Sequence, residues 1–153
     1  MQDFPHIYHV TATADSLENL SLTSAGLPVI TSAAPKEFGG PGDKWSPETL
    51  LIAAVADCFV LTFRAIASAS KLPWLTLTCA VEGCLDRQDG VTRFTAFDIV
   101  VVLEVPQDTN EGRALRLLEK AEKNCLITNS LVAPVKLQAS IIINRDAESG
   151  QAS

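Results

Sequence analysis

The sequence predicts an α+β fold in which two helices are inserted among runs of strands. The 153 residues are 47% hydrophobic, which is enough apolar material for one sizeable core. Segments that alternate apolar and polar residues indicate strands, whereas two others have the apolar spacing of helices. The order is strands, helix, two strands, helix, strand. Such grouping is typical of α+β folds rather than of a βαβ nucleotide-binding unit.

The first third of the chain predicts a strand meander. Apolar and polar residues alternate over residues 7–13 and 20–23, and a short apolar run follows the turn formers Gly26 and Pro28. A loop rich in Gly and Pro occupies residues 35–43. A phosphate-binding glycine loop lies between a strand and a helix and has a characteristic glycine spacing, which these glycines lack. We therefore expect that they shape the backbone of the loop and that no cofactor is bound.

Residues 46–70 predict a long apolar helix. Ser46 suits the N-cap, Pro47 suits the first helical position, and Glu48 places a negative charge in the first turn, where the helix dipole favours it. The helix is expected to end before Pro73, because proline cannot continue it.

A β-hairpin is predicted next. Residues 75–81 alternate apolar and polar side chains, Gln88-Asp89-Gly90 forms a turn, and residues 94–105 are rich in β-branched side chains. These two runs are expected to pair as antiparallel strands.

The last third predicts a second helix and a final strand. Apolar residues recur at helical spacing from about Asn110 to Asn124, and Val135 to Ile143 has the composition of a strand. We therefore expect a single domain over residues 1–145, followed by a polar tail over residues 146–153.

Charge and composition exclude some partners. The net charge is −6 and the acidic residues are scattered, so no basic stripe is available for phosphates and nucleic acid is not expected as a partner. The long helix is apolar enough to suggest a membrane span. However, Asp57 and Arg64 would each cost about 2.5–3.5 kcal/mol near a bilayer centre, so a buried core helix is the better interpretation.

The N-terminal residues bear on localisation. Met1 to Val10 contain neither a basic segment nor an apolar run, so no signal peptide is predicted and a cytoplasmic protein is expected. Four cysteines without an export signal indicate reduced thiols, because cytoplasmic reductants keep ordinary disulfides open.

No metal site is predicted from the cysteines and histidines. Cys79 and Cys84 are five residues apart on a strand and should point to opposite faces, and the same holds for His6 and His9. No further ligands follow at zinc-site spacing.

Two cysteines lie at helix positions. Cys58 is inside the long helix and Cys125 is at the end of the second helix, so the two thiols could meet and form a reversible disulfide. The alternative is that each is a small buried hydrophobe, as a lone cysteine in an alanine-rich helix usually is. An apolar pocket walled by Phe38 and Trp45, next to the Gly-rich loop, is a further possibility.

Four motifs together resemble the OsmC/Ohr family of thiol-dependent hydroperoxide reductases. Their order and spacing cover about residues 36–143. The motifs are Gly39-Gly40-Pro41-Gly42, the Ser46-Pro47-Glu48 helix start with its Leu-Leu pair, Ala56-Asp57-Cys58-Phe59, and Asn124-Cys125-Leu126-Ile127 with the Asn-Ser-Leu that follows.

The resemblance implies an intertwined homodimer with antiparallel sheets around a long central helix and active sites at the subunit interface. It further implies that Cys58 is the peroxidatic cysteine, that Cys125 is the resolving cysteine and that Glu48 organises the site. The partners implied are an organic hydroperoxide, or another small apolar substrate, and a dithiol reductant of the lipoyl type.

Helix geometry constrains the role of Glu48. In an unbroken helix the ten residues between Glu48 and Cys58 correspond to roughly 15 Å along the axis. Either the helix breaks between them or Glu48 serves a neighbouring site across a dimer interface.

The chain departs from the family pattern in its charges. The Ohr pattern supplies an arginine from the N-terminal strands, but no arginine precedes Arg64 here. An ordinary thiol is only about 3% ionised at pH 7, so a reactive cysteine benefits from a cationic neighbour. The available substitutes are Lys36, Lys44, His6 and His9.

Two other functions remain as alternatives to a peroxidase. A non-catalytic apolar-ligand or redox-sensing module would use the same cleft without turnover. A small acyl-thioester hydrolase also wraps a sheet around an apolar helix, although here a second helix interrupts the strands. Hydroperoxide turnover that is abolished by Cys58→Ser would separate the enzyme from the binding module.

Overall fold

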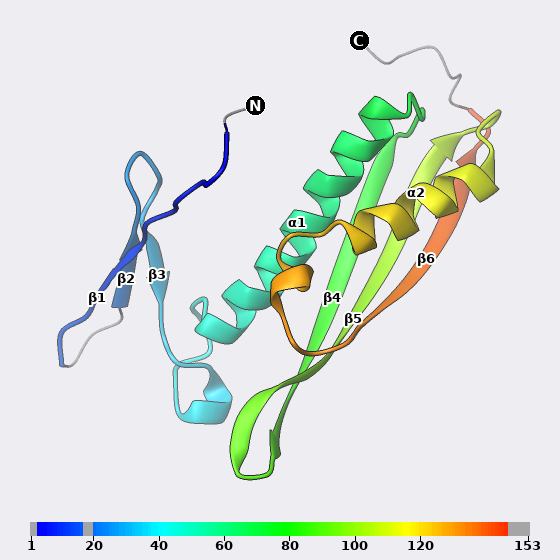
Figure 1. Cartoon of the computed structure of the whole chain (residues 1–153). Helices are drawn as coiled ribbons and strands as arrows, with labels where there is room; N and C mark the ends of the chain where they lie inside the picture. The colour runs from blue at the N-terminus through cyan, green and yellow to red at the C-terminus, as the bar shows by residue number, and fades with distance from the viewer. Residues whose placement is uncertain (1–2, 17–19, 147–153) are drawn as a thin grey trace. The chain divides into compact units, whose positions relative to one another are not determined.

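The computed structural model describes residues 3–16 and 20–146 (Figure 1). It divides the chain into two compact units, Met1–Leu51 and Ile52–Ser153. All but the first residue of the predicted tail 146–153 lies outside the described residues.

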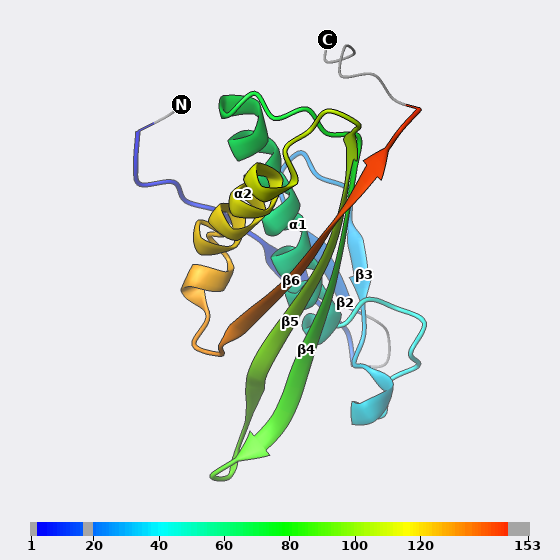
Figure 2. The same cartoon turned by 90° about the vertical axis from the view of Figure 1, so that its right-hand side faces the viewer.

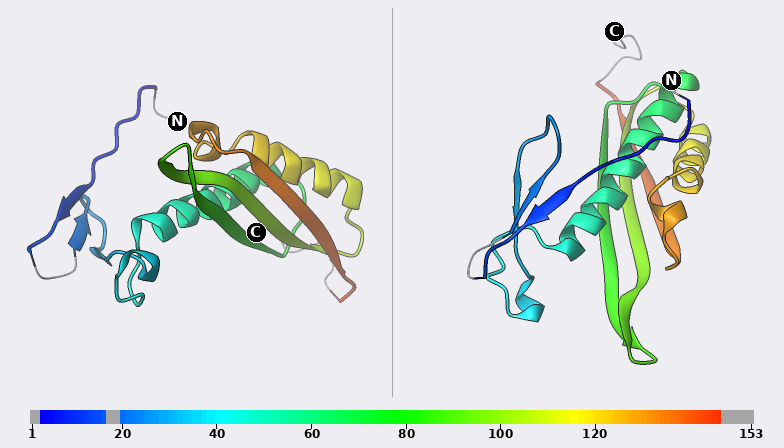
Figure 3. Two further views of the ribbon diagram at one scale, coloured as in Figure 1. Left: turned by 90° about the horizontal axis from the view of Figure 1, so that it is seen from below. Right: turned by 60° about the vertical axis from the view of Figure 1, so that its left-hand side comes forward.

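The first unit contains the predicted meander. Strands β1 (Thr11–Thr13), β2 (Leu20–Thr23) and β3 (Ile30–Ser32) pair antiparallel in the order β1-β2-β3, as the N-terminal arrows of Figure 3 show. The first strand is shorter than the predicted range 7–13. Its pairing with β2 covers residues 11–13, because β2 itself is four residues long.

The Gly-rich loop contains one short 3-10 turn, Lys36–Phe38, which the sequence did not predict. Gly39 closes this turn at φ 81°, a left-handed conformation that glycine adopts at little cost. At Gly40 a Cβ atom would lie 1.6 Å from the carbonyl oxygen of Ala34. Both glycines therefore serve the backbone shape of the loop.

Helix α1 (Pro47–Ala69) is the predicted long helix and runs without a break for 23 residues. Its start is fixed by a reciprocal cap. The Ser46 hydroxyl accepts a hydrogen bond from the Thr49 backbone N–H (3.2 Å), and the Thr49 hydroxyl accepts one from the Ser46 N–H (2.8 Å). At the other end Lys71 turns left-handed, and the Leu72 N–H bonds back to the Ala67 carbonyl (2.9 Å).

The second unit is built on a three-stranded sheet of β4 (Thr76–Gln88), β5 (Val91–Pro106) and β6 (Val135–Asn144). The predicted hairpin is present: β4 and β5 are antiparallel, and Asp89 and Gly90 both have positive φ in the turn.

The expectation of antiparallel sheets needs a correction for the last strand. β6 pairs parallel with β5, since helix α2 (Glu111–Lys123) carries the chain back along the sheet between them. The predicted ends of α2 are confirmed. The Asn110 side chain caps it by accepting from the Arg113 N–H (2.8 Å), and Asn124 closes it.

Both helices cover the same face of this sheet (Figure 2). The core between them consists of every fourth residue along α1, alternate residues of β5 and one stripe of α2. Its fully buried members are Val55, Phe59, Phe63, Ala67, Phe97, Ile99, Val101, Leu103, Val105, Ala114, Leu118 and Ala121.

Only one face of α1 is buried. By length and composition α1 could cross a membrane, yet just 22% of its apolar stretch is buried within the chain. Asp57 and Arg64 are exposed, and so is Leu61, at 49%. A helix that is apolar all round is normally buried on every side, so α1 differs from a typical core helix in leaving one apolar face exposed.

Candidate functional site

Two structural elements of the second unit position the cysteines that the sequence singled out. Cys58 lies in the middle of α1, directly before the buried Phe59, and is itself half-buried. Cys125 follows the last turn of α2, where its N–H bonds to the Glu122 carbonyl (3.1 Å), and its side chain is fully buried.

The fold brings these two thiols together. The Cys58 and Cys125 side chains are close enough that each shifts the pKa of the other, and no disulfide joins them. The contact is made because α1 and α2 lie on the same face of the sheet (Figure 2), with the short 3-10 turn Thr128–Ser130 closing the segment after Cys125.

Hydrogen-bond donors surround the Cys58 sulfur. Burial alone would raise the pKa of Cys58. That effect is outweighed by hydrogen bonds from the backbone of Ile127, the Cys125 thiol, the Thr62 hydroxyl and the backbone of Leu126, which together hold the pKa of Cys58 below its ordinary value of 9.0. The Thr62 oxygen lies 3.9 Å from the sulfur.

Cys125 is shifted in the opposite direction. Burial raises its pKa, and the adjacent Cys58 raises it further, although hydrogen bonds with Thr128 act against this. The pair is therefore unequal: Cys58 ionises first, and Cys125 stays a protonated thiol beside it. One thiol of such a pair can attack an electrophile while the other supplies a proton or captures the product.

A third cysteine lies within electrostatic range of this pair. Cys79 is on the helix-facing side of β4, opposite the buried Val101. Burial, together with the charge of Cys125, raises the pKa of Cys79 to about 11. The alternation of β4 predicted that Cys79 and Cys84 lie on opposite faces, whereas the proximity of Cys79 to Cys125 could be seen only in the fold.

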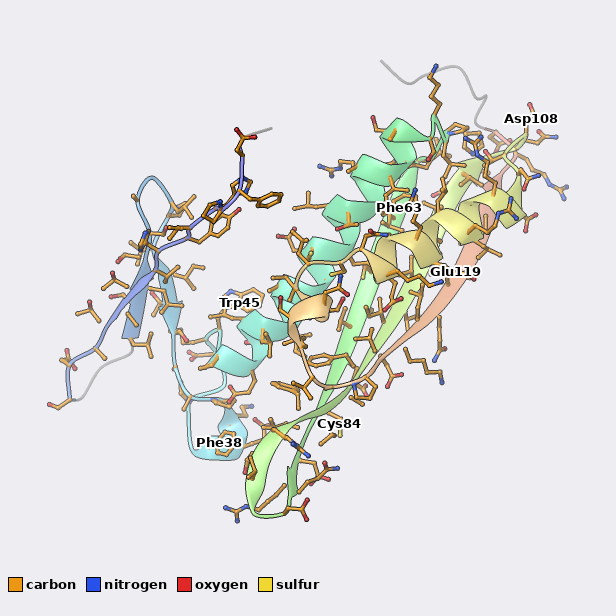
Figure 4. All side chains as sticks on the ribbon, viewed as in Figure 1. Phe38, Trp45, Phe63, Cys84, Asp108 and Glu119 are labelled. Atoms are coloured by element: carbon orange, nitrogen blue, oxygen red, sulfur yellow. The ribbon has the colours of Figure 1, made fainter. Side chains whose placement is uncertain are left out.

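Cys84 lies apart from the thiol pair. It is exposed on the opposite face of β4, as the spacing predicted, and near the hairpin end of the strand (Figure 4). Among the described residues there is no group of three or more His, Cys, Asp or Glu side chains that could hold a metal ion.

Glu48 is separated from Cys58 along the helix. Because α1 is unbroken, the first of the two alternatives, a break between Glu48 and Cys58, is wrong. The two residues are roughly 15 Å apart along the axis. The Glu48 Oε2 atom is buried and has no hydrogen-bond partner within the described part of the chain. Burying such an oxygen is costly unless a donor reaches it.

The cation candidates and the aromatic pair of the loop belong to the first unit. Lys44 pairs with its neighbour Asp43 (3.1 Å), and the Lys36 side chain packs close to Gly42. Phe38 and Trp45, the predicted pocket walls, are both exposed, at 58% and 52% (Figure 4).

The unequal pair predicts a selective reaction with iodoacetamide. At neutral pH, Cys58 should be alkylated first, because its pKa is below 9.0 while that of Cys79 is about 11. The thiolate fraction of Cys58 should exceed that of Cys79 at least about a hundredfold at neutral pH, and this advantage should disappear as the pH rises through the pKa of Cys79, at about 11. Peptide mapping over a pH series measures this, with urea-unfolded protein as the control. Equal labelling of Cys58 and Cys79 in the folded protein would contradict the assignment.

Comparisons with known proteins agree with one another. The family model described as OsmC-like protein matches residues 40–140. The chain is 25% identical over 147 residues to the protein YmaD of Bacillus subtilis, covering 94% of this chain and 97% of that one. It is 30% identical over 125 residues to an organic hydroperoxide resistance protein of Xanthomonas axonopodis pv. citri, covering 80% and 84% of the two chains.

A solved structure has the same fold. The OsmC-like protein of Vibrio cholerae superposes with a TM-score of 0.79 at 19% identity, covering 89% of this chain and 100% of that one.

Proposed function

The chain belongs to the OsmC-like protein family, and from this membership and the unequal thiol pair we propose that it is a thiol-dependent peroxidase for organic hydroperoxides. The observation that carries the proposal is the contact between Cys58 and Cys125, with the pKa of the first lowered and that of the second raised. The name of the Xanthomonas relative, an organic hydroperoxide resistance protein, supports the substrate class and a role in the oxidative stress response.

The proposed reaction starts at Cys58. Its thiolate attacks the distal oxygen of the hydroperoxide; the O–O bond breaks, the alcohol leaves after taking up a proton, and Cys58 becomes a sulfenic acid. The Cys125 thiol then attacks the Cys58 sulfur, which forms the disulfide and releases water. A dithiol reductant exchanges with this disulfide, leaves as its own oxidised form and returns both cysteines to thiols.

The pKa values of the two thiols suit these roles. The attacking thiol must be ionised, and the hydrogen bonds to Cys58 favour its thiolate. The second thiol should not compete for the peroxide, and burial keeps Cys125 protonated until the sulfenic acid forms beside it. We propose the cytoplasm as the compartment, because its reductants would return the pair to thiols after each reaction.

We further propose a homodimer in which Glu48 completes the site of the partner subunit. The free apolar face of α1 needs a cover, and the first unit exposes a series of large apolar side chains that a second copy would bury. These exposed side chains are Phe4, Ile7, Tyr8, Val10, Leu27 and Val29. The unbroken α1 keeps Glu48 away from Cys58 of its own chain, which favours a role across the interface.

The direct test adds one equivalent of an organic hydroperoxide to the reduced protein. We expect the intact mass to fall by about two hydrogens, and peptide mapping to find a Cys58–Cys125 disulfide while Cys84 stays reduced. Hydrogen peroxide serves as the comparison substrate. Unchanged thiols, or slow oxidation scattered over all four cysteines, would contradict the peroxidase and favour the binding or redox-sensing module.

A further inference from the structure

Thr62 lies one helical turn after Cys58, and its hydroxyl is directed at the cysteine sulfur. The Oγ1 atom of Thr62 and the Sγ atom of Cys58 are 3.9 Å apart, within hydrogen-bonding range for sulfur. Residues four apart on a helix share a face, which explains the contact. A threonine inside a helix commonly bonds to the carbonyl four residues earlier; here its hydroxyl bonds to the side chain of that same residue.

The direction of this hydrogen bond depends on the charge of the cysteine. While Cys58 is a thiol, either group can donate. Once Cys58 is a thiolate, only the hydroxyl has a hydrogen to give, so the bond persists and becomes charge-assisted. Two further donors, the backbone N–H groups of Leu126 and Ile127, also face the sulfur. All three donors are uncharged.

Among the described residues, no Asp, Glu, Lys or Arg side chain is among the groups that shift the pKa of Cys58. Asp57 and Arg64 are exposed, and Glu48 is more than two turns back along α1. In the segment after α2, the titratable group next to Cys58 is the Cys125 thiol. On β4 the titratable group is Cys79, and it interacts with Cys125. Since no arginine precedes Arg64 in the sequence, the family's usual source of positive charge is missing.

We propose that Thr62 activates Cys58 by donating its hydroxyl hydrogen to the thiolate, so that neutral hydrogen bonds take the place of a cation in this site. This inference builds on the assignment of Cys58 as the reacting thiol. It assigns to Thr62 a function that none of the sequence motifs contains.

The test compares Thr62→Val with Thr62→Ser. Valine keeps the shape of threonine without the hydroxyl, whereas serine keeps the hydroxyl. The ionisation midpoint of Cys58 is read from the pH dependence of its alkylation by iodoacetamide, followed by peptide mapping. In Thr62→Val we expect the midpoint to rise by about one pH unit, with about tenfold less thiolate at neutral pH. In Thr62→Ser it should stay close to the wild-type value.

Two controls keep the result interpretable. Rapid labelling of the buried Cys125 would reveal that Thr62→Val has unfolded. In that case the ionisation midpoint of Cys58 is compared between Thr62→Ala, which lacks the hydroxyl, and Thr62→Ser, which keeps it. Lys36→Gln and Lys44→Gln test the competing source of activation. A higher midpoint in either lysine variant, with none in Thr62→Val, would overturn the proposal and assign the activation to a cation.

The outcome is independent of peroxidase activity. A raised midpoint in Thr62→Val, in a protein that does not turn over hydroperoxide, supports the role of Thr62 and refutes the peroxidase. Turnover by the wild type with an unmoved midpoint in Thr62→Val supports the peroxidase and refutes the role of Thr62.

Discussion

Replacing Cys58 by serine is expected to abolish hydroperoxide turnover, whereas replacing Cys125 by serine should permit one reaction per site. A serine hydroxyl stays protonated at neutral pH, so Cys58→Ser loses the nucleophile and the rate should fall by roughly 10³-fold or more. In Cys125→Ser the Cys58 thiolate is still present and still consumes one equivalent of peroxide. It then remains a sulfenic acid, or is oxidised further, because the thiol that captures it is missing.

The two variants are distinguished by stoichiometry as well as by rate. Peroxide consumption without a reductant gives the number of reactions per site, and peroxide consumption with a lipoyl-type dithiol in excess gives the turnover of the wild type. A dimedone adduct on Cys58, found by mass spectrometry, identifies the sulfenic acid in Cys125→Ser. Cys84→Ser is the matched control, since Cys84 is exposed on the opposite face of β4 and should not affect turnover. Full activity in Cys58→Ser would refute the proposed mechanism.

Mixing two impaired variants is expected to restore activity if Glu48 serves the partner subunit. Glu48→Gln alone should be about 10- to 100-fold slower, the loss that corresponds to one charged hydrogen bond at the site. In a mixed dimer with Cys58→Ser, one site receives both an intact Cys58 and an intact Glu48, while the other site lacks both.

The expected recovery can be stated in advance. Equal amounts of the two variants, unfolded and refolded together, should form mixed dimers in about half of the population, each with one intact site, and so regain about a quarter of wild-type activity. The two variants refolded separately and then combined are the control. Recovery no greater than that of the control would mean that each site uses the Glu48 of its own chain or none.

The elements with strong local signals were predicted well. The starts of both helices could be predicted from Ser46 and Asn110, because Ser and Asn are residue types whose side-chain oxygen accepts a hydrogen bond from a free N–H of the first turn. The hairpin turn could also be predicted from local residue types, since Asp89 and Gly90 both tolerate the positive φ that a tight turn requires.

The pairing of distant segments could not be predicted in the same way. Nothing in the composition of β6 distinguishes parallel from antiparallel pairing; the direction follows from how α2 crosses the sheet. The 3-10 turns at Lys36 and Thr128 are also too short to produce a periodic pattern.

The candidate site was predicted in its principal residues but not in its surroundings. The motifs pointed to Cys58 and Cys125, and the fold places them in contact. Their catalytic roles remain predictions. Thr62 was not predicted. Its spacing of four residues from Cys58 on a helix is a usable signal, but a neutral hydroxyl carries no charge that would mark it as part of a site.

The parallel pairing of β5 with β6 has a consequence for how the protein matures. The β4–β5 hairpin involves only neighbouring segments and can form early, whereas β6 can join only after α2 has closed a long loop. Because Cys125 lies in the segment between α2 and β6, a chain emerging from the ribosome carries Cys58 for some time without its partner. Until that segment has docked, Cys58 also lacks the backbone N–H groups of Leu126 and Ile127 that favour its thiolate. We therefore expect the newly made chain to react with peroxide slowly, as an ordinary thiol does, and to become reactive only when the capturing thiol is in place.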